Sequence, residues 1–127
     1  MLNKMFKSVL EQDRSSVVIC DLNHVIVYMN PSAKKNYANR GGGELVGKSL
    51  LNCHNSDSNE IIRKVVEWFK ESTSNNMIYT FHNDKQNKDV YMVALRDDDG
   101  NLLGYYEKHE FRNKETADTY DFSKSLV

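Results

Sequence analysis

The sequence has few cysteines, a single proline and no long run of apolar residues. Its two cysteines, Cys20 and Cys53, are too few for a disulfide scaffold and are not spaced as a Cys-x-x-Cys metal or redox motif. The apolar stretches, such as residues 17–20, are far shorter than the roughly 20 residues that a membrane-spanning helix needs. We therefore expect no association with a membrane and a reducing, cytoplasmic location.

The sequence also lacks an excess of charge of one sign. It contains 17 basic and 18 acidic residues in a length of 127, and neither half is strongly basic. A nucleic-acid partner is therefore not expected, because such proteins carry a basic surface. The first residues lack the apolar stretch and small-residue cleavage site of a signal peptide. The length allows one domain.

An amphipathic helix is predicted over residues 1–11, ahead of the domain at 12–111. Its apolar residues recur at helical spacing, and they are Leu2, Met5, Phe6, Val9 and Leu10. A free helix of this length is marginal in water, so the apolar face must dock either on the chain's own sheet or on a second copy. The sequence predicts a homodimer with these residues at the interface. The polar residues 112–127 are predicted to form a tail.

Five strands are predicted between that helix and the tail, at residues 17–20, 25–29, 77–82, 90–95 and 102–107. The turn residues 21–24 connect the first two strands, and the Asp-Gly pair at 99–100 connects the last two. A short helix follows Pro31, and a longer one begins near Asp57, whose spacing from Glu60 suits a capping box. The order predicts an α+β fold, a five-stranded antiparallel sheet with a helical belt on one face.

The longer helix carries one apolar stripe. The stripe consists of Ile61, Ile62, Val65, Val66 and Phe69, and the opposite side is charged. Residues at this spacing share one face of a helix, so we expect the stripe to lie against the sheet.

Three motifs in this order resemble the PAS domain family. Residues 19–33 resemble its opening signature of strand, Asp-x-x-Gly turn, strand, Asn and Ala, although His24 stands where the family has Gly. Residues 44–48 resemble its short central helix leading to Gly-Lys, and residues 96–104 its last hairpin. The resemblance spans residues 12–110. It implies a sensor domain that holds ligands between its sheet and its helical belt.

A narrower likeness concerns Gly47, Cys53, His54 and Ser58. A subclass of PAS domains carries Gly, Cys-His and Ser at this spacing, although its intervening prolines are replaced here by Asn55 and Ser56. The subclass therefore stays open.

The candidate ligand site combines the long helix, the segment before it and the inward strand residues. Its predicted pocket wall is Val18, Cys20, Cys53, His54, Ile61, Val65, Phe69, Tyr79, Phe81, Met92 and Ala94. The alternative is that these side chains fill a core without a cavity, because periodic apolar residues form the core by default.

Two residues suggest cofactors. His54 is a candidate haem ligand, since one proximal imidazole can hold haem and haem-binding PAS domains place a histidine near this helix; the alternative is a histidine that binds backbone at the helix start. Cys53 suggests flavin less strongly, because only Asn52-Cys53 matches the flavin motif Asn-Cys-Arg-Phe-Leu-Gln. The cofactor stays unknown. His24, His82 and His109 are expected to be exposed.

The resemblance predicts a signalling module that binds a small molecule or a protein, with output through association with itself or with a separate signalling protein. Two alternatives stay open: a haem-based redox or gas sensor that uses His54, and a ligand-free dimerisation module. We do not expect an enzyme, because adjacent Cys53 and His54 form no established catalytic arrangement.

Overall fold

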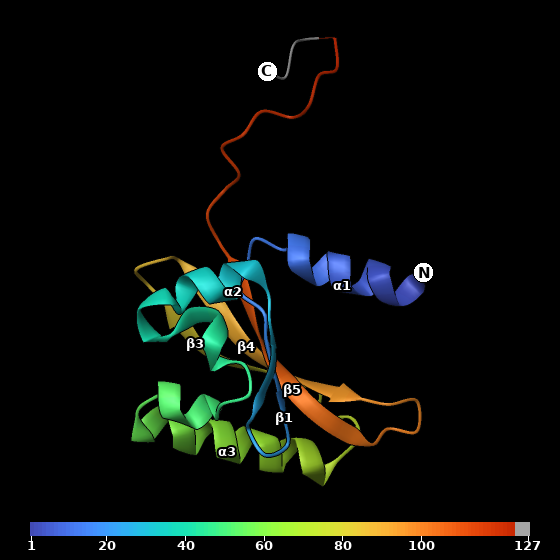
Figure 1. Cartoon of the computed structure of the whole chain (residues 1–127), viewed down its shortest axis with the longest axis vertical. Coiled ribbons are helices and arrows are strands. Elements are labelled where there is room, and N and C mark those ends of the chain that lie inside the picture. Colours follow the sequence, from blue (N-terminus) through green and yellow to red (C-terminus); the bar gives the residue numbers. More distant parts are fainter. Residues whose placement is uncertain (124–127) are drawn as a thin grey trace.

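A five-stranded antiparallel sheet forms the centre of the protein (Figure 1). The computed structural model describes residues 1–123. The strands are β1 (Val18–Asp21), β2 (Ile26–Met29), β3 (Met77–Asn83), β4 (Lys88–Arg96) and β5 (Leu102–Phe111), and their order across the sheet is β2-β1-β5-β4-β3. This arrangement confirms the predicted α+β class and the antiparallel five-stranded sheet.

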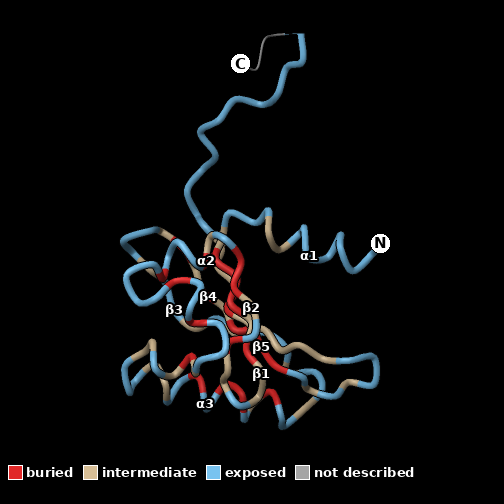
Figure 2. The backbone as a smooth tube through the Cα atoms, in the orientation of Figure 1, coloured by how far each residue is buried: buried red, intermediate tan, exposed pale blue. Residues whose placement is uncertain are grey.

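Helices cover one face of the sheet. They are α2 (Pro31–Asn36), three 3₁₀ turns η1 (Ala38–Arg40), η2 (Gly42–Leu45) and η3 (Leu50–Cys53), and the long helix α3 (Ser56–Glu71). One core joins both layers, with Tyr105 and Met92 from the sheet and Phe69 from α3 almost fully buried. Figure 2 shows the buried segments in the middle of the sheet and along the side of α3 that faces it.

The apolar stripe of α3 packs against the sheet as predicted, with one exception. Ile62, Val65, Val66 and Phe69 are buried, whereas Ile61 is 50% exposed. Ile61 lies at the edge of the stripe, where α3 borders a cavity instead of the packed core.

The two ends of α3 are held by polar side chains. Asn55 caps the N-terminus by accepting a hydrogen bond from Ser58 N at 2.8 Å, so the helix begins at Ser56, one residue before Asp57. The expected Asp57–Glu60 capping box is therefore wrong, because Asn55 already occupies the N-cap position. At the other end, Arg96 of β4 donates to the carbonyl oxygens of Phe69 at 2.6 Å and Ser72 at 3.1 Å.

The N-terminal helix α1 (Leu2–Gln12) stands away from the sheet (Figure 1). None of its residues is buried, and Leu2, Met5, Phe6 and Val9 are each more than half exposed. Leu10 is partly buried. The apolar face of α1 therefore does not cover the chain's own sheet, which was one of the two arrangements expected from its length.

The buried side chain of Asn30 joins α1 to the domain. Its amide nitrogen donates to the carbonyl oxygens of Leu10 at 3.0 Å and Ser15 at 2.9 Å. Its amide oxygen accepts from Val17 N and from Ala33 N, each at 2.9 Å, so it also caps α2. One fully buried amide thus fixes where α1 ends, β1 begins and α2 starts.

The chain leaves β5 as an exposed segment without helix or strand up to residue 123. Arg14 and Glu115 form an ion pair at 3.3 Å between this segment and the α1–β1 connection. Residues 124–127 of the predicted tail lie outside the described residues. Within residues 1–123, no helix has the length and apolar character needed to cross a membrane.

Candidate functional site

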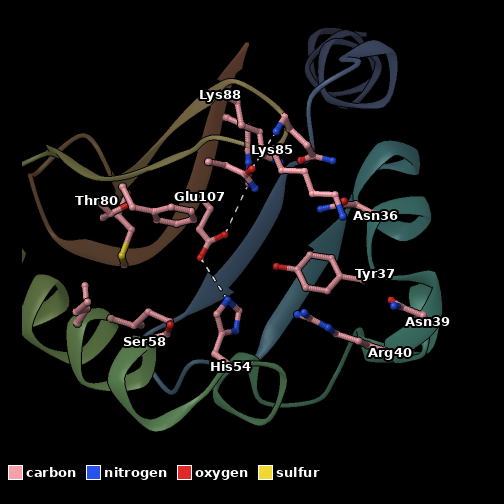
Figure 3. Close-up of a pocket in the computed structure, with 17 residues that line it drawn as sticks. Asn36, Tyr37, Asn39, Arg40, His54, Ser58, Thr80, Lys85, Lys88 and Glu107 are labelled. Atoms are coloured by element: carbon pink, nitrogen blue, oxygen red, sulfur yellow. Dashed lines mark hydrogen bonds and ion pairs between the residues drawn. The ribbon is translucent and has the colours of Figure 1, made fainter. Parts of the chain in front are cut away.

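A cavity of about 610 Å³ lies between the first turn of α3, the α2–η1 segment and the inner face of β3, β4 and β5 (Figure 3). Its volume is in the range of small-molecule sites. The residues that line it are Asn36, Tyr37, Asn39, Arg40, His54, Ser58, Ile61, Ile62, Thr80, Phe81, Asn83, Lys85, Gln86, Lys88, Met92, Glu107 and His109.

The period of the strands brings charged groups to one end of this cavity. In β4, Lys88 shares the inner face with the buried Val90 and Met92. In β5, His109 pairs with Val90, and Glu107 pairs with Met92. Lys88, Glu107 and His109 therefore lie on the inner face of the sheet, next to the core.

Glu107 is at the centre of the polar end. Its side chain is 11% exposed, and its carboxylate oxygens lie 3.8 Å from His54 Nε2 and 3.7 Å from His109 Nε2 (Figure 3). Burial raises the pKa of Glu107, but the interactions with His109 and His54 outweigh burial and bring the pKa below its usual value. Glu107 is therefore a buried carboxylate that stays charged at neutral pH.

Lys88 is the second buried charge, with 4% of the residue exposed. Its ammonium group lies 5.7 Å from the centre of the Phe111 ring, which is a cation–π distance. Burial lowers the pKa of Lys88, and the charge of Glu107 opposes this change only partly. Within residues 1–123, Lys88 forms no ion pair at a distance of 4.0 Å or less.

On the helical side of the cavity, polar side chains are held in place by contacts with backbone carbonyl groups. His54 Nδ1 lies 3.1 Å from the carbonyl oxygen of Leu50, which directs Nε2 toward Glu107. Arg40 donates to the carbonyl oxygen of Cys53 at 3.1 Å and stacks over the ring of Tyr37. Burial raises the pKa of Tyr37, so its hydroxyl stays protonated, and Figure 3 shows this group directed into the cavity.

The residues predicted as pocket wall separate into four places, the fourth being the hollow beside Cys53. Four of them line the cavity: His54, Ile61, Phe81 and Met92. Five lie in or against the packed core: Val18, Cys20, Val65 and Phe69 are buried, and Ala94 packs against them. Tyr79 is 55% exposed, and its hydroxyl donates to Asp89 instead of facing the cavity.

The two cysteines lie apart from the main cavity. Cys53 lines a separate hollow of about 510 Å³ together with Leu45 and Ser49. Cys20 is buried beside Tyr105, and burial raises the pKa of its thiol to about 12. The Cys20 thiol is therefore protonated at physiological pH and a poor nucleophile.

The cavity also contains charged residues that the predicted pocket wall did not include, above all Lys88 and Glu107. The sequence carried a signal for them, because Lys88 alternates with Val90 and Met92, and Glu107 with Tyr105. The expected exposure of His109 is wrong, since its side chain is only 8% exposed. The expected exposure of His24 is also wrong, because its ring is half-buried and hydrogen-bonded to Tyr105.

The arrangement can bind a small molecule, because apolar side chains and buried charges line the same cavity. Within residues 1–123, no group of three or more His, Cys, Asp or Glu side chains is placed to hold a metal ion.

Comparison with known proteins gives consistent results. The sequence pattern of the PAS domain family matches residues 14–107. The fold is similar to the C-terminal domain of a protein from Streptococcus mutans, with a TM-score of 0.67 and 18% identity over 86% of this chain and 84% of that chain. It is also similar to the PAS domain of a protein from Colwellia psychrerythraea, with a TM-score of 0.64 and 12% identity over 87% and 97%.

A third similar structure is the Aer2 receptor of Vibrio cholerae, described as a dual PAS–haem oxygen sensor. Its TM-score is 0.54, with 17% identity over 74% of this chain and 90% of that chain. A search of curated proteins gives no significant match. The family match covers most of the chain and confirms the resemblance found in its motifs. The chain therefore belongs to the PAS domain family.

Proposed function

We propose that this PAS domain is a sensor that binds a small organic molecule in the cavity between α3 and the sheet. PAS domains are typical of signal-transduction sensors, and the cavity is the observation that carries the proposal for this chain. Its volume of about 610 Å³ suits a small ligand, and it offers both apolar contacts and polar anchors. A filled core, the ligand-free alternative, leaves no such space.

The proposal can be tested by blocking the cavity with a matched pair of substitutions in the first turn of α3. Ser58 lines the cavity, whereas Ser56 is exposed in the same turn. Ser58→Trp should fill the binding space, and Ser56→Trp should leave it open. The wild-type protein is first screened by thermal unfolding and native mass spectrometry against a metabolite extract and its fractions.

A bound compound should stabilise the wild type by about 2.7 kcal/mol at a hundredfold excess over Kd, which raises Tm by several degrees. The stabilisation should persist in Ser56→Trp and disappear in Ser58→Trp. Stabilisation that survives in Ser58→Trp contradicts binding in this cavity. If no fraction stabilises the wild type and no compound co-purifies, the ligand-free dimerisation module becomes the better description.

Haem binding through His54 is a second candidate function. Two observations favour it: Nδ1 of His54 is held by the carbonyl of Leu50, so Nε2 faces the cavity, and a receptor described as a PAS–haem oxygen sensor has a similar fold. The arrangement does not fit haem as it stands, because the Glu107 carboxylate lies 3.8 Å from Nε2, where iron and the porphyrin need room. We expect no Soret band after incubation with haem. A Soret band that appears in the wild type and is lost in His54→Ala would instead support haem binding through His54.

We further propose that the output passes through association, either with a second copy or with a separate signalling protein. The exposed apolar face of α1 supports the second copy, because the chain's own sheet does not cover it. Asn30 ties the end of α1 to the start of β1 and to α2, so α1 is joined to the ligand-binding domain through a buried contact.

A further inference from the structure

The cavity carries a positive formal charge in a chain whose net charge is negative. Among its lining residues Arg40, Lys85 and Lys88 are basic and Glu107 is acidic, which gives a formal charge of +2 with the histidines neutral. The whole chain has a formal net charge of -1. A concave site with walls of low dielectric concentrates ions of the opposite charge. This charge balance favours an anionic ligand.

Lys88 supplies an independent observation. The residue is 4% exposed, and within the described residues no carboxylate lies within 4.0 Å of its ammonium group. A buried ammonium is costly without a partner, because burial removes its hydration. Glu107 attracts Lys88 from a longer distance, but its carboxylate oxygens are oriented toward His54 and His109. Lys88 is thus a largely buried cation that has the Phe111 ring beside it but, among residues 1–123, no carboxylate at ion-pair distance.

His109 adds an unsatisfied polar atom beside the same space. Its Nε2 is directed toward Glu107, and its Nδ1 is buried without a hydrogen-bond partner. Buried polar atoms are nearly always paired in folded proteins, so Nδ1 is an uncommon unpaired group close to the cavity. Lys88 and His109 both come from the inner face of the sheet, on the adjacent strands β4 and β5.

Apolar side chains line the cavity beside the charged ones and limit the ligand further. Ile61 and Ile62 from α3, with Phe81 and Met92 from the sheet, can contact a hydrocarbon body. Many phosphate sites add free N–H groups at a helix N-terminus to their basic side chains, and this cavity does not offer that contact. In α3 the first turn is already capped by Asn55 and contains the acidic Asp57.

We infer that the cavity selects an organic carboxylate, with Lys88 as the counter-ion of the carboxylate and the apolar body lying against Ile61 and Phe81. This inference rests on the proposed function and names the class of ligand for the same site.

The test uses 3-phenylpropionate and its neutral amide, 3-phenylpropionamide, which differ mainly in charge, at constant ionic strength. The acid should bind the full chain saturably in isothermal titration calorimetry, and the amide should bind at least about tenfold more weakly. Inorganic phosphate forms a third arm and should compete poorly with the acid.

Three variants assign the effect to Lys88. Lys88→Met removes the buried charge in a side chain of similar length and should weaken binding of the acid about tenfold or more. Lys64→Met makes the same change at an exposed position of α3 and should leave binding unchanged. Glu107→Gln raises the formal charge of the cavity and should tighten binding, so the inference stays testable if Lys88→Met is poorly folded.

The outcomes separate this inference from the proposed function. Equal binding of acid and amide, or wild-type affinity in Lys88→Met, overturns the carboxylate inference. If the ligand of the wild type is a neutral compound and Ser58→Trp abolishes its binding, the carboxylate inference is also overturned, while the sensor proposal stands. If no compound of any charge binds in the cavity, both fail.

Discussion

At the scale of single residues, the turn between β1 and β2 shows how one side chain offsets a backbone cost. His24 has a φ of 63°, a left-handed conformation that favours glycine. Its Nδ1 lies 2.8 Å from the hydroxyl of Tyr105, and the two rings meet edge to face. The resemblance to PAS domains identified this position as one where the family has Gly, and the positive φ is the physical reason.

The positive φ of His24 predicts that a glycine variant is more stable than an alanine variant at this position. His24→Gly removes the left-handed strain, about 1 kcal/mol, and also the hydrogen bond, worth a similar amount, so it should stay near wild-type stability. His24→Ala loses the hydrogen bond and keeps the strain, so it should be about 1 kcal/mol less stable than His24→Gly. Urea denaturation measures both variants.

The neighbouring Asn23, which is not at positive φ, serves as the control. There alanine should be at least as stable as glycine, because glycine adds entropy to the unfolded chain. If His24→Ala equals or exceeds His24→Gly in stability, strain at this turn is not the reason for the family's glycine.

At the scale of elements, α3 is both a wall of the core and a wall of the cavity, and its position depends on β4. The guanidinium of Arg96 contacts the carbonyl oxygen of Phe69 in the last turn of α3 and those of Ser72 and Asn75 just beyond it. It also donates to Gly100 in the β4–β5 hairpin. A cation at a helix C-terminus is favourable, because the carbonyl groups there carry partial negative charge.

Removal of this contact should loosen the helix. Arg96→Met is expected to lower the free energy of unfolding by about 2–3 kcal/mol, because it leaves helix-end carbonyls without charged donors. Arg96→Lys should recover only part of this loss, since an ammonium cannot reach as many acceptors. Chemical denaturation gives the energies, and hydrogen exchange at residues 66–71 locates the change.

Lys70→Met is the matched control for Arg96→Met. Lys70 is a cation in the last turn of α3, but it is exposed and, within residues 1–123, its one ion pair is with Glu67, so its loss should cost less than about 0.5 kcal/mol. If Arg96→Met and Lys70→Met lower the free energy of unfolding equally, the hydrogen bonds of Arg96 add nothing to the effect of its positive charge.

At the scale of the whole molecule, the exposed face of α1 is the feature that the single chain does not account for. Leu2 is 59% exposed, Phe6 58% and Val9 69%, and together they form one side of an 11-residue helix. An isolated helix of this length is marginal in water and gains stability by burying such a face. A second copy would supply that burial.

The association prediction uses substitutions on opposite sides of α1. Leu2→Asp with Phe6→Asp should give monomers by size-exclusion chromatography with light scattering, where the wild type should be dimeric. Lys4→Gln with Lys7→Gln changes the net charge by the same amount on the polar side and should leave the dimer intact. A monomeric wild type, or a dimer that survives the first pair, contradicts an α1 interface.

Much of the fold could be predicted because local patterns carried it. The alternating strands, the Asp-Gly hairpin signal and the stripe from Ile62 to Phe69 depend on neighbours in the chain, so they were visible in the sequence. The candidate site was less visible. Lys88 and His109 lie just beyond the predicted strand ends, and only the full length of β4 and β5 extends the inner face to them.

The sequence by itself determined the family, the antiparallel sheet and the side of α3 that meets it, because each follows from periodicity and turn chemistry within short segments. The tertiary structure alone decided that Lys88, Glu107 and His54 share one space, since they come from three elements and meet only through the pairing of β4 with β5 and the docking of α3. It also decided that α1 stays uncovered by the sheet, because Asn30 holds the end of that helix at the edge of the domain. Long-range packing is the physical reason for both.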